Sequence, residues 1–476
     1  MPFSDQAMSL PEDFLFKIKE LKNFTKTTIS IDPSSGQTSY GAGSKISFTL
    51  PYASLLSMND LALVVDGETT NLPVHAGDIT NGVFFPRNMS SMIEEIEIKV
   101  NGQIVQSIPR YNDVYNVHDN LKVKKNTHNI LDNSKPNLKV KYNPTTNVLQ
   151  KIEDFKAPDD ASLSDATNKD NYLKDKDTYV ITNWYGLMGS ADEKEVSANF
   201  IDTNLLGEVI ISFRLAGNNV LMYGDNIATG TVSVADRTTA QANANTSFKF
   251  ENVRLSAIRY NMPDTYYNAI SSNLSSGSKY RVAFNHYSIY SSSAGQGKGS
   301  VRFNENSRDI KYMMSFYTDS TRNNSAKPKN VVKTNGFNQS PYFQYDGRFH
   351  NRSQYQIGST LLPVNQMTTH DTFLDTTRLL GKKGDLSYEM HDQIEGIDEW
   401  SYYYFASPLS LEFSQDDDSV KLLSGLSSEN LPISVSYNYE HRAIGGGYTF
   451  EQDANVLVCT TRMIEIGNNQ SVALVI

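Results

Sequence analysis

A glycine-rich stretch, AGQGKGS at residues 294–300, has the residue types of a loop that binds phosphate. Such a loop needs a Ser or Thr directly after its Lys to ligate the metal ion. Here Gly299 follows Lys298, and the first Gly of the required spacing is missing. The stretch also lies between two strand-like segments, with no helix behind it to receive an anion. We therefore interpret it as a turn.

Histidine and acidic residues gather at three places where a metal ion could bind. These are YEMHDQIEG with Glu389, His391 and Asp392, NYEH with Glu440 and His441, and the run Asp416–Asp418. None has the i, i+4 histidine pair of a zinc-binding helix. Turn or surface histidines account for the first two. The acidic run could bind a divalent cation, but a solvated loop is its usual role.

The sequence offers no convincing candidate for a catalytic nucleophile either. The chain has no GxSxG elbow, and its one cysteine, Cys459, lies late in a strand-like segment, a poor position for a nucleophile. Glu395 and Glu399 would be the acid and the nucleophile of a glycan-cleaving enzyme on a β-scaffold, which is the weakest of three functional hypotheses. We assign no catalytic, cofactor-binding or metal-binding residue, and no cofactor.

Composition narrows the class of protein. The chain has 476 residues, 39% hydrophobic and 11% aromatic, which indicates folded β-rich structure in two domains or in one domain with large insertions. Its net charge of −10 makes nucleic acid an unexpected partner. A single cysteine excludes a disulfide within the chain and suits a reducing compartment. We expect neither a signal peptide nor a membrane-spanning segment.

Strands dominate the pattern along the chain. The hairpin IEEIEIKVNGQIVQSI, 93–108, alternates apolar and polar residues up to Asn101-Gly102, the signature of a type I′ turn. A strict two-residue turn leaves Ile104 and Ile108 on the charged face, so either both faces are partly covered or a bulge intervenes. Further strands are predicted at the following segments: 25–32, 45–50, 61–67, 178–184, 207–215, 250–260, 279–290, 300–304, 310–319, 340–349, 354–363, 409–414, 432–440 and 455–466. This pattern indicates an all-β sandwich or barrel.

Helices are few. Residues 9–24 place Phe14, Ile18 and Leu21 on one face, so they predict either a helix packed on its own domain or an arm that docks on a neighbour. Short helices are also expected at 111–121, in the turn 263–270 and at 370–381, where Asp371 is the predicted cap.

A polar stretch and a weak internal repeat organise the chain. Residues 122–177 are dense in Lys, Asn and Asp, which is typical of a long solvated insertion. Outside it, a strand, a Gly, an apolar run, a Pro and a short helix follow one another in both halves. We predict an N-terminal arm at 1–24, a first domain at 25–265 and a second at 266–476, with the linker near 262–278.

Two segments carry a resemblance to a known family. These are DGETTNLPVHAGDITNGVFFPRNMSSMIEEIEIKVNGQIVQSIPRYNDVYNV, 66–117, and FENVRLSAIRYNMPDTYYNAI, 250–270. With the order of segments, they resemble the double jelly-roll major capsid proteins, the viral lineage of adenovirus hexon, and most of all those of polinton-like viruses and virophages. The resemblance implies an all-β fold of two tandem eight-stranded antiparallel jelly-roll sandwiches with a few short helices and long loops.

The resemblance also implies a function. The chain would be a structural protein of a DNA virus that forms homotrimers with a pseudo-hexagonal outline, and these capsomers would build an icosahedral virion shell. Its partners would be other copies of itself, penton and minor capsid proteins, and an inner membrane. The arm at 9–24 would lie beneath the capsomer and reach a neighbour, a minor protein or the inner membrane. Assembly would take place in the host cytoplasm or nucleus. The alternative is a β-sandwich that binds glycans, like a viral spike or fibre, with SYYYF at 401–405 as the place for sugar stacking.

Overall fold

The structure is a computed structural model that describes 24–70, 83–86, 88–122, 140–143, 148–151, 176–189, 200–223, 247–277, 279–323, 341–343, 345–347, 349–379, 405–411, 425–428, 433–442, 452–467 and 472–475. The predicted helix at 9–24 lies outside these residues except for Phe24. Most of the predicted insertion at 122–177 also lies outside them.

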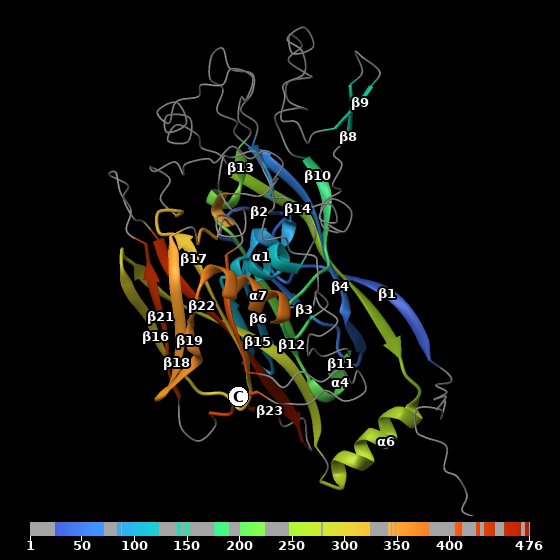
Figure 1. The fold of residues 1–476 in the computed structure, drawn as a ribbon. Coiled ribbons are helices and arrows are strands. Elements are labelled where there is room, and N and C mark those ends of the chain that lie inside the picture. Colours follow the sequence, from blue (N-terminus) through green and yellow to red (C-terminus); the bar gives the residue numbers. More distant parts are fainter. Residues whose placement is uncertain are drawn as a thin grey trace, which may run out of the picture.

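The first half of the chain folds as two packed antiparallel sheets (Figure 1). The larger sheet has the strand order β1-β14-β4-β10, with β2 beside β14 and β11 beside β4. Its strands are β1 (Thr25–Ile31), β2 (Ser39–Tyr40), β4 (Leu55–Thr70), β10 (Lys176–Ile181), β11 (Phe200–Asp202) and β14 (Ser247–Asn261). The smaller sheet, β3-β12-β6-β7, contains β3 (Lys45–Thr49), β6 (Ile93–Val100), β7 (Gln103–Pro109) and β12 (Val209–Leu215).

The second half repeats this arrangement. One sheet has the order β15-β22-β17-β20, with β23 beside β22, and the other has the order β16-β21-β18-β19. The strands are β15 (Tyr280–Ala294), β16 (Lys298–Glu305), β17 (Ile310–Asp319), β18 (His350–Ile357), β19 (Thr360–Met367), β20 (Ser407–Ser410), β21 (Ile433–His441), β22 (Gln452–Ile466) and β23 (Val472–Val475).

The two halves have the same topology. Counting the eight principal strands of each half along the chain, one sheet has the order first, eighth, third, sixth, and the other has the order second, seventh, fourth, fifth. Antiparallel strands with this Greek-key order are a jelly roll. The predicted fold class, two tandem eight-stranded jelly rolls, is therefore confirmed.

The 93–108 hairpin shows how the sequence sets the register. Asn101 and Gly102 have φ values of 49° and 79°, as a type I′ turn requires. Lys99 pairs with Ile104 and Ile98 with Gln106, so Val105 is an extra residue in β7. Of the two explanations offered above, the bulge is confirmed. It returns Ile108 to the buried face and leaves only Ile104, 47% exposed, outside.

Four α-helices accompany the sheets in the described residues: α1 (Tyr111–Lys122), α4 (Thr203–Leu206), α6 (Asp264–Ser275) and α7 (Thr369–Leu379). α1 follows β7, and α7 follows β19, the equivalent strand of the second half. The predicted cap of α7 is corrected. Thr368 precedes the helix, and the Asp371 carboxylate accepts from its backbone nitrogen at 2.9 Å and from its hydroxyl at 2.8 Å. Thr368 is therefore the cap, and Asp371 bonds back to it, as in a capping box.

Two strand predictions were wrong in detail. Within 340–349, residues Pro341–Phe343 form a 3₁₀ helix (η6) instead of a strand. Residues 354–363 are not one strand but parts of β18 and β19, which turn at Gly358. Inside the predicted solvated insertion, β8 (Val140–Asn143) pairs with β9 (Val148–Lys151) as a hairpin.

One apolar core connects the halves. Its buried side chains include Ile98 and Phe213 from the first sandwich and Tyr287, Phe316 and Leu457 from the second. A second core fills the interior of the second sandwich. The predicted domain limits, 25–265 and 266–476, place the division at α6, and they remain a prediction. In the described residues, no helix is long and apolar enough to cross a membrane.

Candidate functional site: the junction of the two sandwiches

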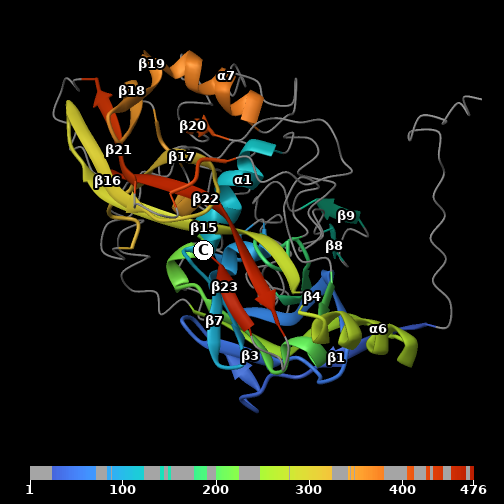
Figure 2. The same ribbon diagram turned by 90° about the horizontal axis from the view of Figure 1, so that it is seen from below.

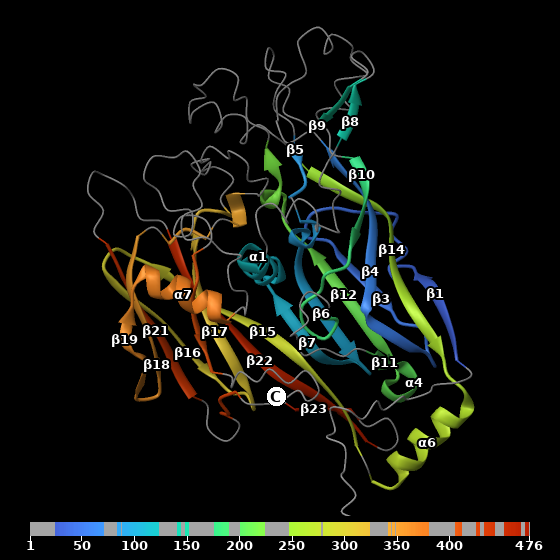
Figure 3. The same cartoon turned by 45° about the vertical axis from the view of Figure 1, so that its right-hand side comes forward.

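α1 lies between the two halves, where the edge strand β7 meets β15 (Figure 3). All side chains from Tyr111 to His118 are buried. A surface helix keeps one face in water, so burial of two full turns shows that the second sandwich covers the face that the first leaves open. The junction is therefore as closely packed as a domain interior.

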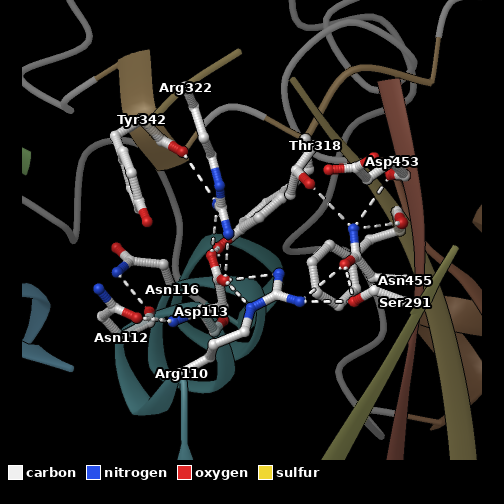
Figure 4. A network of polar contacts seen from close by, with 12 residues as sticks. Arg110, Asn112, Asp113, Asn116, Ser291, Thr318, Arg322, Tyr342, Asp453 and Asn455 are labelled. Carbon is white, nitrogen blue, oxygen red and sulfur yellow. Dashed lines mark hydrogen bonds and ion pairs between the residues drawn. The ribbon is translucent and has the colours of Figure 1, made fainter. Parts of the chain in front are cut away.

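Asp113 is at the centre of the junction. Arg322, which follows β17, donates to its carboxylate from Nη1 to Oδ1 at 2.8 Å and from Nη2 to Oδ2 at 2.6 Å. Asp113 is 0% exposed and Arg322 9%. A two-bond pair of this kind fixes the angle between the groups as well as the distance. Figure 4 shows the carboxylate between this guanidinium and that of Arg110.

Arg110 extends the network into β15 and β22. Its Nε donates to Asp113 Oδ2 at 2.8 Å, and its Nη1 donates to Ser291 Oγ at 2.7 Å and to Asn455 Oδ1 at 2.8 Å. Asn455 in turn donates from Nδ2 to Thr318 Oγ1 at 3.0 Å. Three strands of the second sandwich are thus connected to the first turn of α1.

These contacts keep the junction charged. Burial by itself would raise the pKa of Asp113, but the two guanidinium charges and their hydrogen bonds hold that pKa well below its ordinary value. Burial would likewise lower the pKa of Arg322, but Asp113 raises it above its ordinary value. Tyr345 donates to the Asp113 carbonyl at 3.3 Å, and burial together with the Asp113 charge raises its pKa well above the usual range. The pair is therefore ionised at every pH at which the protein is handled.

Two further polar bridges flank the ion pair. Gln106, 1% exposed, donates to the Asn285 carbonyl across the junction at 3.0 Å and accepts from the Leu187 nitrogen at 2.9 Å. His118 Nδ1 lies 2.7 Å from the Val114 carbonyl, and its Nε2 lies 2.7 Å from the Tyr312 hydroxyl of the second sandwich. A carbonyl only accepts, so Nδ1 carries the hydrogen.

The arrangement holds the halves together. Each charge at the junction is matched by a partner a few ångströms away. Among the described residues, no three His, Cys, Asp or Glu side chains are grouped so that they could hold a metal ion.

The residues weighed from sequence lie elsewhere. Lys298 begins β16 directly after the turn at 295–297, so the AGQGKGS stretch is the turn that was predicted. The prediction of a surface or turn position was wrong for His441, which is 3% exposed at the end of β21 and pairs in register with His350. Burial lowers its pKa to about 4. Cys459 is buried in β22. The remaining candidates lie outside the described residues: Glu389, His391, Asp392, Glu395, Glu399, Tyr402–Tyr404 and Asp416–Asp418.

Sequence reasoning missed the junction. Asp113 and Arg322 are 209 residues apart, and each is an ordinary polar residue beside an apolar segment. The one available signal was the helix at 111–121, whose tyrosines and valines point in several directions and so require cover on more than one side.

Comparisons with known proteins agree with the topology. No protein-family profile and no curated sequence matches the chain. Among solved structures, a chain of the PBCV-1 virus capsid has a TM-score of 0.58 at 10% identity, over 97% of this chain and 99% of that one. The Faustovirus major capsid protein gives 0.55 at 7% identity, over 95% and 92%. The mavirus major capsid protein gives 0.50 at 10% identity, over 100% and 96%. The chain therefore has the double jelly-roll fold of these viral capsid proteins.

Proposed function

We propose that this chain is a viral major capsid protein, a structural protein without enzymatic activity that assembles into homotrimers and, through them, into an icosahedral virion shell. Its fold over almost the whole chain is that of proteins named as capsid components of PBCV-1, Faustovirus and mavirus. Penton proteins, minor capsid proteins and an inner membrane would be its further partners.

The trimer proposal rests on a difference in burial between equivalent elements of the two sandwiches. In the first sandwich, β7 and α1 are covered by β15 and β22 of the second, and Val105, Ile108, Val114 and Val117 are buried. Among the described residues, none covers the equivalent β19 and α7 of the second sandwich in this way. Val364 is 84% exposed, and Leu361 and Leu374 are 45% and 47% exposed.

The uncovered face supports contact with another copy. By the topological equivalence, the strands that correspond to β15 and β22 are β1 and β14 of the first sandwich. If β19 and α7 of one chain pack on β1 and β14 of the next, the contact within the chain is repeated between chains. Such a heterologous contact forms a ring where the rotation closes. Three chains would place six similar sandwiches around one axis, which gives a pseudo-hexagonal outline.

The mass of the protein in solution tests this proposal. Light scattering after size-exclusion chromatography should give three times 53.3 kDa, and negative-stain images should show a six-cornered outline. The variant Val364→Asp places a charge in the proposed contact and should give monomers. Ile104→Asp is the matched control, because it introduces the same charge at an exposed apolar residue outside that face. A wild-type monomer, or an unchanged trimer in Val364→Asp, would contradict the proposal.

A further inference from the structure

The end of the first sandwich that carries α4 and α6 has several aromatic side chains that are not fully buried. α6 projects from this end of the molecule, beneath the sheets in Figure 1, and Figure 2 shows the same end from below. Phe24 and Phe200 pack against Tyr260 on β14, with ring centroids 6.2 and 5.6 Å away. Tyr266 and Tyr267 of α6 are in ring contact at 5.2 Å. We call the following set the base patch: Phe24, Phe200, Tyr260, Tyr266, Tyr267 and Tyr280.

The base patch is incompletely covered. Phe24, Phe200 and Tyr280 are 40%, 45% and 43% exposed. None of the twelve residues of α6 is buried, although Tyr266, Tyr267, Ile270 and Leu274 form a half-buried stripe along one side. Exposed aromatic groups of this extent mark a contact surface. An isolated helix of twelve residues is marginal in water, so α6 also needs a partner for its own stability.

The surface surrounds an unsatisfied carboxylate. Asp202 is 5% exposed, its Oδ1 accepts from the Asn204 nitrogen at 2.9 Å, and its Oδ2 has no hydrogen-bond partner. Burial raises the pKa values of Tyr266, Tyr267 and Tyr280, and the charge of Asp202 raises them further, while burial also raises the pKa of Asp202 itself. Lys26 Nζ lies 5.9 Å from the centroid of the Tyr260 ring, and the Nε of Arg259 has no hydrogen-bond partner. A buried oxygen left open in this way favours a ligand that brings a donor or a cation.

The chain itself supplies a segment of that chemistry. Twenty-three residues precede Phe24, and Phe24 is part of the base patch, so the segment joins the patch directly. Residues 9–23 carry an apolar stripe of Phe14, Ile18 and Leu21, flanked on the same side by Lys17. A helix over 9–23 would be about 22 Å long and α6 is about 18 Å, so the two are matched in length. A tethered segment binds at high effective concentration.

We propose that residues 9–23 of the chain pack on the base patch of the same chain, with Phe14, Ile18 and Leu21 against α6 and Tyr260 and a lysine directed at Asp202. This contact completes the cover of α6, the helix that joins the two sandwiches. It is independent of the proposed capsid role, since it needs no other chain.

Hydrogen exchange measured by mass spectrometry on the full chain tests the contact. The double variant Phe14→Asp, Ile18→Asp should exchange the amides of α6 at least about tenfold faster than the wild type, because the cover is lost. Phe16→Asp is the matched control, since residue 16 lies on the opposite side of the predicted helix from Phe14, and it should leave α6 unchanged. Tyr266→Ser should release residues 9–23 in the same way from the other side of the contact. Thermal unfolding of each variant identifies any general loss of fold.

Four outcomes would overturn the proposal. One is an unchanged exchange rate of α6 in the double variant, and another is an equal effect of Phe16→Asp. The third comes from a pair of cysteines, Leu21→Cys with Tyr267→Cys, in a mixture of isotopically light and heavy protein. Disulfides within one copy support the proposal, whereas light-to-heavy disulfides would assign the segment to a neighbouring copy. Protection of α6 that appears only with phosphatidylcholine vesicles would assign the patch to a lipid surface instead.

Discussion

Asp113 and Arg322, 209 residues apart in the chain, form a two-bond ion pair with both side chains buried between the sandwiches. Isolated, either charge would be strongly disfavoured there, since burial removes its hydration. The pair therefore couples the halves in a specific way, because each sandwich supplies the group that the other needs.

Removal of one partner should destabilise the protein far more than removal of both. Asp113→Asn leaves two guanidinium groups without their carboxylate, and we expect a loss of about 3–5 kcal/mol in the free energy of unfolding. The double variant Asp113→Leu, Arg322→Met should recover most of that loss. Urea unfolding measures both.

An exposed pair is the control for this cycle. Arg378 and Asp375 form an i,i+3 pair at 2.9 Å whose side chains are 68% and 35% exposed. Asp375→Asn should therefore change the unfolding free energy by less than about 0.5 kcal/mol. A loss of similar size in Asp113→Asn and Asp375→Asn would contradict the importance assigned to the junction pair.

Gly186 is required by the same junction. Its φ is +92°, and a Cβ there would lie 2.6 Å from Gln106 Nε2, which bridges to the second sandwich. Gly186→Ala should cost about 2–3 kcal/mol from backbone strain and displacement of Gln106. Gly295→Ala, in the turn before β16, has open space around it and should stay within about 0.5 kcal/mol of wild type. Chemical denaturation that ranks the two variants the other way would exclude this explanation.

Acid should destabilise the second sandwich through its buried histidines. Burial lowers the pKa of His286 and His350 to about 3, helped by Arg462 in the first case and by His441 and Arg442 in the second. Burial lowers the pKa of His441 to about 4, against a hydrogen bond to the Gly295 carbonyl that raises it. In the unfolded chain each has a pKa of about 6.5. The folded state is therefore fully favoured above about pH 6.5, and each histidine removes up to ~1.4 kcal/mol per pH unit as the pH falls from there toward 4.

His441→Gln should reduce the dependence of the unfolding free energy on pH by the contribution of one proton. Urea midpoints between pH 8 and pH 4 give the slopes, and equal slopes for wild type and His441→Gln would count against the assignment. Asp113 does not interfere with this measurement, because its pKa is lowered in the folded protein. Its contribution to stability is lost only below about pH 3.9, its pKa in the unfolded chain.

Loss of the Thr368 cap of α7 should destabilise the protein less than the changes at the junction. Thr368→Ala removes the hydroxyl that donates to the Asp371 carboxylate, which we expect to cost about 1 kcal/mol. The pKa of Asp371, lowered by its bonds to Thr368, should rise in this variant, which NMR titration would detect. Thr377→Ala removes a hydroxyl from the last turn of the same helix and should leave that pKa unchanged.

The features that could be predicted from the sequence are those determined by residues close together in the chain. With a strict turn at Asn101-Gly102, Ile104 and Ile108 would lie on the charged face, so the sequence predicted either a bulge or partial cover of both faces. The strand register contains the bulge, at Val105. The repeated order of strand, Gly and short helix in both halves reflects the shared topology. The prediction of a strand at 340–349 was wrong because tertiary contacts determine the backbone conformation there. Tyr345 is directed to Asp113, a residue of the other sandwich. No local pattern could have paired Asp113 with Arg322.

The position of β22 has a consequence for synthesis of the chain. This strand lies between β15 and β17 and supplies Asn455 to the junction, yet it is among the last segments to leave the ribosome. Until then β15 has no neighbour in its sheet, and Arg110 lacks its contact with Asn455. The nascent chain must therefore carry a large apolar surface for most of the time it takes to translate the second half, which makes it a natural client for chaperones that bind growing chains.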